Sequence, residues 1–169
     1  MALPDKPENS VAHNYFKMKE PGTKKVRILT DFIAYYQAWV DKKPMRRDQI
    51  DQFPDSTFDN GKPPRLAWAC AVWNYADSRI QVWEITQAGI RKTLKALAKD
   101  DEWGEDFKGY DIKVTRSGMG LEDTEWTLMP SNKSPLAKDI AVQWDAVSAF
   151  DSFDLNALLT NGDPFNPNR

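Results

Sequence analysis

A chain of 169 residues, 41% of them hydrophobic and 28% charged, has the length and composition of one globular domain with appended segments. With one Cys and one His, it can form neither an intramolecular disulfide nor a Cys/His zinc site. No apolar run approaches the ~20 residues of a membrane span, and the N-terminus lacks the apolar core of a signal peptide, so we expect a cytoplasmic protein without a membrane partner.

Charge and aromatic content together permit a nucleic-acid ligand. Residues 24–99 carry 14 Lys and Arg against 8 Asp and Glu, whereas residues 100–138 carry five bases against nine acids and residues 139–169 one base against five acids. A nucleic-acid binder needs a local basic surface and not a basic total. Seven Trp, five Tyr and eight Phe are many rings for one small core, and a surplus on the surface suits stacking on a flat ligand.

The first third of the chain predicts an arm, a long strand and a long loop. Residues 1–23 contain three prolines and little periodicity, and we expect a loosely held arm. Over residues 24–36 apolar and polar side chains fall on opposite faces, which predicts one long strand. Residues 41–64 are polar and broken by four prolines, which predicts a loop long enough to be functional or disordered.

A hairpin and a helix follow. Residues 65–75 and 79–85 alternate in the way strands do, and the Asp-Ser pair between them suits a tight turn. The period then changes, with Thr86 as the expected N-cap and Ile90 and Leu94 four residues apart on one face. Basic residues on the opposite side of this predicted helix suit a solvated face.

Two more strands complete the predicted domain. Residues 110–116 and 122–129 alternate again and are joined by a glycine-bearing turn. Five strands with a helix between the third and the fourth predict a mainly β fold, a five-stranded OB-type Greek-key barrel at residues 24–130. Residues 131–169 are expected to be a flexible acidic tail with room for a short helix around residues 140–147 and a disordered end.

Candidate DNA-binding residues follow from that fold, because OB barrels bind oligonucleotides or oligosaccharides across strands 2 and 3 and the loops that join strands 1–2 and 4–5. Exposed rings stack on bases, for which we favour Trp73 and Tyr75, and arginines neutralise phosphates. Each ring also has a structural interpretation, which we favour for Trp68, Trp83 and Trp126 as core residues. The full candidate set is Arg46, Arg47, Phe53, Phe58, Lys62, Arg65, Trp73, Tyr75, Arg79, Lys113 and Arg116.

No catalytic set is expected. The chain lacks the GxxxxGK[ST] phosphate loop, and His13 stands alone, so neither nucleotide hydrolysis nor a Ser-His-Asp triad has support. Asp55 and the Asp-Ile-Lys of residues 111–113 match the short pattern of metal-dependent nucleases, but Asp55 falls in a proline-broken stretch and not on a strand. Cys70 lies in an apolar run, which favours a buried, inert thiol. We therefore expect no enzyme, no metal and no cofactor.

Two runs carry a family resemblance: VWEITQAGIRKTL at residues 82–94 and GYDIKVTRSG at residues 109–118, followed by the Thr-Glu-Trp of residues 124–126. They resemble the strand-then-helix segment and the last two strands of the single-stranded DNA-binding proteins of tailed bacteriophages. The resemblance covers residues 24–130. It implies an OB fold that coats single-stranded DNA during phage DNA replication, recombination and repair, in the cytoplasm of the host.

This chain departs from that family in two regions. Many relatives have a cysteine cluster for zinc in the region that corresponds to residues 41–64, and this chain has no Cys there, so the resemblance implies no metal. Such proteins often recruit replication or recombination proteins through an acidic C-terminal tail. The acidic residues of 139–169 and the Asp163-Pro164-Phe165 triplet are a weak version of that tail, and Arg169 departs from an acidic tip.

The sequence thus predicts sequence-tolerant binding of single-stranded DNA by base stacking and phosphate neutralisation. Two alternatives stay open. The same fold could be a protein-interaction module whose rings dock another polypeptide, or it could bind RNA, because contacts to the 2′-hydroxyl cannot be read from residue types.

Overall fold

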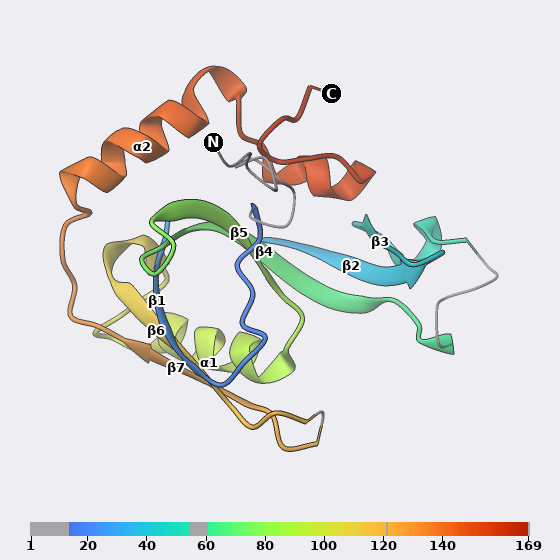
Figure 1. Ribbon diagram of the computed structural model, residues 1–169, viewed down its shortest axis with the longest axis horizontal. Helices are drawn as coiled ribbons and strands as arrows, with labels where there is room; N and C mark the ends of the chain where they lie inside the picture. The colour runs from blue at the N-terminus through green and yellow to red at the C-terminus, as the bar shows by residue number, and fades with distance from the viewer. Residues whose placement is uncertain (1–13, 55–60, 121, 169) are drawn as a thin grey trace, which may run out of the picture.

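The computed structural model describes residues 14–54, 61–120 and 122–168, which form a mainly β fold around one antiparallel sheet (Figure 1). In this part of the chain no helix is long and apolar enough to span a membrane. The strands are β1 (Gly22–Ile28), β2 (Ile33–Val40), β3 (Lys43–Arg47), β4 (Arg65–Asn74), β5 (Arg79–Ile85), β6 (Asp111–Ser117) and β7 (Glu125–Pro130). The helices are α1 (Ala88–Lys99) and α2 (Lys138–Ser148), with 3-10 helices η2 (Ile50–Gln52), η4 (Phe107–Gly109), η5 (Ala149–Asp151) and η6 (Leu155–Thr160).

Strand β4 is the centre of the sheet. The sheet order is β3-β2-β4-β1-β6-β7, and β5 pairs with the other edge of β4. The single strand that the sequence predicts over residues 24–36 is interrupted after Ile28 and resumes at Ile33. Both pieces pair with β4, β1 with residues 72–74 and β2 with residues 65–69, so together they act as one bent strand.

The sheet is open, so the expected closed five-stranded barrel is wrong. Among the described residues no hydrogen-bonded ladder joins β5 to β7, and β3 adds a further strand at the far edge. The order of elements is as predicted, since α1 lies between β5 and β6, the third and fourth strands of the expected barrel. Helix α1 follows β5 directly and packs against β7, which places a helix where a closed barrel would have a ladder.

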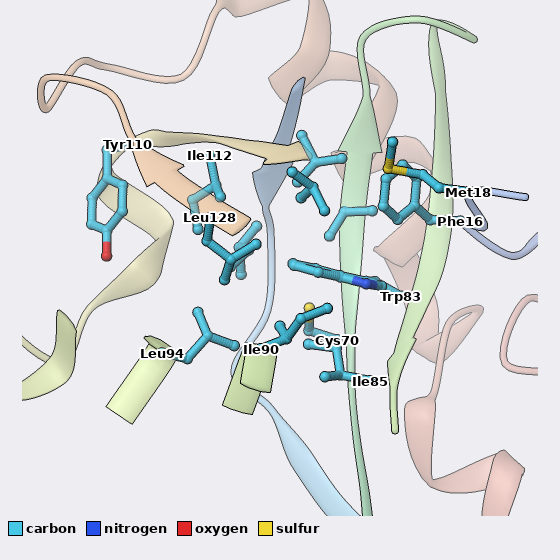
Figure 2. Packing of buried hydrophobic residues seen from close by; sticks show 14 residues of the cluster. Phe16, Met18, Cys70, Trp83, Ile85, Ile90, Leu94, Tyr110, Ile112 and Leu128 are labelled. Carbon is cyan, nitrogen blue, oxygen red and sulfur yellow. The ribbon is translucent and has the colours of Figure 1, made fainter. Parts of the chain in front are cut away.

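The main core fills the inner side of the sheet and is covered by α1 (Figure 2). Alternation along β4 puts Cys70 on this side and turns its neighbours outward. From α1, Ile90 and Leu94 enter the same core, as their spacing of four predicts. Each fully buried aliphatic side chain of this kind contributes about 1.5–3 kcal/mol of transfer free energy, which is what holds α1 on the sheet.

The N-terminal strap, which we define as residues 14–20, runs from β5 toward the turn end of strand β6. Its Phe16 N–H donates to the Val82 carbonyl on β5 at 2.8 Å, and Arg116 Nη1 on β6 donates to the Met18 carbonyl at 2.7 Å. Phe16 and Met18 are buried in the main core, where Phe16 meets Trp83 edge to face. The loosely held arm predicted for residues 1–23 is therefore wrong for the strap and β1.

The C-terminal segment, residues 136–165, covers the outer face of β4 and β5. Helix α2 confirms the short helix expected there, but the disordered end is wrong. Phe165 belongs to a row of rings in which Trp144 and Phe153 lie 5.3 Å apart and Phe153 and Phe165 lie 5.1 Å apart. Asp163 Oδ1 accepts the Phe165 N–H at 2.9 Å and shapes the turn. The small alanines on the outer side of β4 let this segment approach the sheet closely.

A buried arginine fastens the connection to α2. Arg27 on β1 is 3% exposed, and its Nε donates to the Lys108 carbonyl at 2.8 Å. Its Nη2 donates to the Ser134 carbonyl at 2.7 Å, and its Nη1 lies 3.4 Å from Asp111 Oδ1. The guanidinium thus joins β1, η4, β6 and the segment before α2, which the alternating pattern of the first strand does not reveal.

Candidate nucleic-acid interface

A hairpin occupies much of the stretch that we expected to be a loop at residues 41–64. Asp41 and Lys42 have φ angles of 52° and 64°, so the chain reverses within two residues and β3 pairs back on β2. The interpretation as one loop is wrong for residues 43–47, because a tight turn built without glycine or asparagine gives no sequence signal.

Arg46 lies in a buried ion pair. Its Nε and Nη2 donate to the two oxygens of Glu84 at 2.5 and 3.2 Å, and the Tyr35 hydroxyl and the Gln37 amide donate to the same carboxylate. Burial lowers the pKa of Arg46, but the hydrogen bond and charge of Glu84 outweigh burial, so this pKa is raised. Burial and then the charge of Glu84 raise the pKa of Tyr35. The structure therefore commits Arg46 to Glu84 and not to an open phosphate site.

Several other predicted residues lie apart from one another. Arg47 Nη1 donates to the Leu159 carbonyl at 3.1 Å and to Asn161 Oδ1 at 3.2 Å, which fastens the C-terminal segment to β3. Arg79 is half-buried at the start of β5, Phe53 is buried, Lys113 is exposed on β6, and Phe58 lies outside the described residues.

The two rings that we favoured for stacking are not on an open face. Trp73 is 5% exposed and belongs to a cluster with Ile140 of α2. Tyr75 is half-buried; its hydroxyl donates to Asp111 Oδ1 at 2.8 Å, and Lys25 Nζ lies 4.1 Å from its ring centroid. Alternation correctly separates the two faces of β4, but the outer face is covered by the C-terminal segment.

Tyr75 makes stability depend on alkaline pH. Burial, followed by the hydrogen bond and charge of Asp111, raises the pKa of Tyr75 from 10.0 to about 12. Because the folded value is the higher one, the stabilisation is fully present below the unfolded pKa and is lost as the pH rises through the folded pKa. We expect the free energy of unfolding to fall between pH 10 and 12, and to fall less in Tyr75→Phe. Urea denaturation across that range measures this, and identical curves would contradict it.

Lys62, Arg65 and Arg116, by contrast, line one depression, which we call the Trp39 groove. It consists of three adjoining hollows that share Gln37 and Trp39. One side is formed by the strap, drawn in blue in Figure 1, and the other by the β2–β3 hairpin and the start of β4. Arg116 and Trp126, which pair near the turn of the β6–β7 hairpin, close one end.

Trp39 is the functional candidate that sequence reasoning missed. Its side chain is 47% exposed at the end of β2, so a large ring lies open in the middle of the groove. Trp is usually highly buried, and it is enriched at interfaces because it combines a large apolar ring with a polar N–H group. A signal was available, because this Trp lies two residues before a charged turn, near the end of an alternating strand.

The groove is basic. Two acids lie among its exposed or half-buried cations: Glu84, which is already paired with Arg46, and Asp163. Arg116 contacts the Trp126 ring at 5.8 Å, and its Nε is buried without a hydrogen-bond partner among the described residues. The cations are Lys17, Lys19, Lys42, Lys43, Lys62, Arg65 and Arg116.

The strap contributes to the groove by strand-like alternation. Phe16 and Met18 point into the core, whereas Tyr15, Lys17 and Lys19 line the groove. This five-residue pattern is visible in the sequence, but it is short and lies in a proline-bearing stretch, so periodicity alone did not identify it.

The side chains of the groove are suited to a planar, anionic ligand. Within residues 14–54, 61–120 and 122–168 no group of three or more His, Cys, Asp or Glu side chains is placed to hold a metal ion. Cys70 is fully buried, and burial raises the pKa of its thiol, so it is no nucleophile at neutral pH. The open ring can stack on a planar group, and the cations around it can neutralise phosphates.

No protein-family model, no curated protein and no solved structure matches this chain.

Proposed function

We propose that this protein binds single-stranded DNA in the Trp39 groove, by base stacking and phosphate neutralisation and without catalysis. The observation that carries the proposal is an exposed tryptophan in the middle of a basic groove. Stacking on an aromatic side chain contributes about 1–3 kcal/mol per base and tolerates any base sequence. A single strand offers unpaired bases to such a ring, whereas a duplex keeps its bases stacked inside.

The order of the strands supports an OB-type fold for the sheet. If β1 and β2 count as one bent strand, five strands remain with α1 between the third and the fourth, and β3 belongs to the connection between the first two. The Trp39 groove then lies between that connection and the β6–β7 hairpin, where OB folds bind oligonucleotides. We propose that the protein coats single-stranded DNA in phage replication, recombination and repair in the host cytoplasm, as the resemblance implies.

Replacing Trp39 by Ala tests the proposal. We expect the affinity for an oligo-dT to fall by about 5- to 150-fold, the equivalent of about 1–3 kcal/mol, because one stacking platform is lost. The thermal midpoint should change little, since the ring is 47% exposed. Fluorescence anisotropy of a labelled oligonucleotide at two salt concentrations measures the affinity, which should weaken as salt rises.

The matched control is Phe150→Ala, which removes a fully exposed ring after α2, outside the groove. This variant should bind like the wild type. Absence of binding by the wild type at low salt, or equal binding to duplex DNA, would overturn the proposal and favour a protein-interaction module.

A further inference from the structure

One hollow of the Trp39 groove is closed by the C-terminal segment. It measures about 530 Å³, within the ~300–1,000 Å³ of small-ligand clefts. Tyr15 from the strap and Trp39 from β2 both line it, and Asp163 reaches it from the turn after η6. The hollow therefore has the size and the aromatic lining for one nucleobase.

Two side chains that line this hollow, Gln37 and Asp163, can each accept a further hydrogen bond, whereas Glu84 is already occupied. The Glu84 carboxylate already accepts from three neighbouring side chains. Gln37 Nε2 donates to Glu84 at 2.8 Å, which leaves the Gln37 carbonyl oxygen as an acceptor. Asp163 Oδ1 accepts the Phe165 N–H, and within the described residues the second oxygen of Asp163 has no hydrogen-bond donor. Both groups can accept further hydrogen bonds from a ligand.

We propose that this hollow is a nucleobase pocket that prefers cytosine and adenine, whose N4 and N6 amino groups stand where thymine has its O4 carbonyl, over thymine. The inference rests on the proposed function and adds one discriminating position to an otherwise sequence-tolerant interaction. The amino groups of cytosine and adenine donate hydrogen bonds, and carboxylates accept from the N4 amino group of cytosine. Thymine presents a carbonyl oxygen at the same place, which a carboxylate repels.

The charged side chains around the opening of the hollow also suit a nucleotide. Lys17 and Lys43 line the hollow and are exposed, so they can neutralise the phosphates on either side of the bound base. Arg46 lies behind the Tyr15 ring, with its guanidinium carbon 5.7 Å from the ring centroid, and holds that ring in place. Asp163 is the acid in the hollow that no cation pairs with among the described residues, which makes it the group to test.

The experiment compares the full chain's affinity for labelled oligo-dC, oligo-dA and oligo-dT of equal length, by fluorescence anisotropy at one salt concentration. We expect oligo-dC and oligo-dA to bind on the order of five- to tenfold more tightly than oligo-dT. In Asp163→Asn, the Asn carbonyl still accepts the Phe165 N–H and preserves the turn, while its amide can donate to thymine. The preference should therefore disappear or reverse.

Asp145→Asn on α2 is the matched control, because it removes the same charge from an exposed position outside the hollow. This variant should keep the wild-type order of affinities. Equal affinities of the wild type for the three oligonucleotides would overturn the pocket while leaving single-stranded DNA binding intact. An identical change in Asp163→Asn and Asp145→Asn would also overturn it. Absence of binding to any of the three would overturn the proposed function itself.

Discussion

Replacing Trp73 by Ala is expected to lower the free energy of unfolding by about 3–5 kcal/mol and to leave the DNA affinity of the folded protein unchanged. Trp73 is 5% exposed and lies in a cluster with Leu29 and Ile80 of the sheet region and Ile140 of α2. Truncation removes a large buried surface and leaves a cavity, because the backbones of β4 and α2 are held by other contacts and cannot collapse into it.

Urea denaturation followed by circular dichroism measures this loss, and anisotropy with an oligonucleotide measures the affinity. Trp39→Ala is the reciprocal control, since it should lose affinity and keep stability. The opposite result for Trp73→Ala, with stability retained and affinity lost, would show that the C-terminal segment opens and exposes the ring to DNA. The pair of variants thus separates the buried tryptophan from the binding one.

Replacing Arg46 by Met is expected to destabilise the fold by about 3–5 kcal/mol, because it leaves the carboxylate of Glu84 buried without its cation. The two side chains are 10% and 14% exposed and form two hydrogen bonds. Tyr35 and Gln37 would still donate to Glu84, but neither carries a charge to balance it.

The double variant Arg46→Met with Glu84→Gln should regain most of that loss, because no unpaired charge is then buried. Denaturant unfolding of the wild type, the two single variants and the double variant gives the four free energies of unfolding of a double-mutant cycle. If Arg46 bound phosphate instead, Arg46→Met would fold normally and bind DNA more weakly, which would contradict the buried role.

Local sequence patterns predict the individual strands and helices of this fold better than they predict whether the sheet closes into a barrel. The alternation in β4 and the spacing of Ile90 and Leu94 in α1 are short-range signals, and both elements form where they are expected. The sheet is open where β5 meets the strap at Val82, more than sixty residues later in the chain than Phe16. No periodicity within either segment reports such a meeting, so local patterns predict a five-stranded OB-type barrel, whereas the strands form an open sheet.

The prediction of the candidate site is limited for the same reason, because contacts between distant segments decide which side chains are available. The sequence identifies Arg46 and Arg65 as equally available cations, yet Glu84 comes to pair with one of them and not with the other. Similarly, Trp73 and Trp39 are both rings on alternating strands, and only the fold of the C-terminal segment decides that the first is covered. Residue type predicts what a side chain can do, whereas exposure and partners depend on distant segments.

Within five residues the strap both fills the core and lines the groove, so its alternate positions can diverge at different rates. Phe16 and Met18 are constrained by volume, since both fill the main core. Lys17 and Lys19 face the groove, where only charge and reach matter. Positions 16 and 18 should therefore accept only apolar residues of similar size over evolutionary time, while positions 17 and 19 are free to change with the ligand. Selection for a new ligand preference can act at these two positions without a cost to folding.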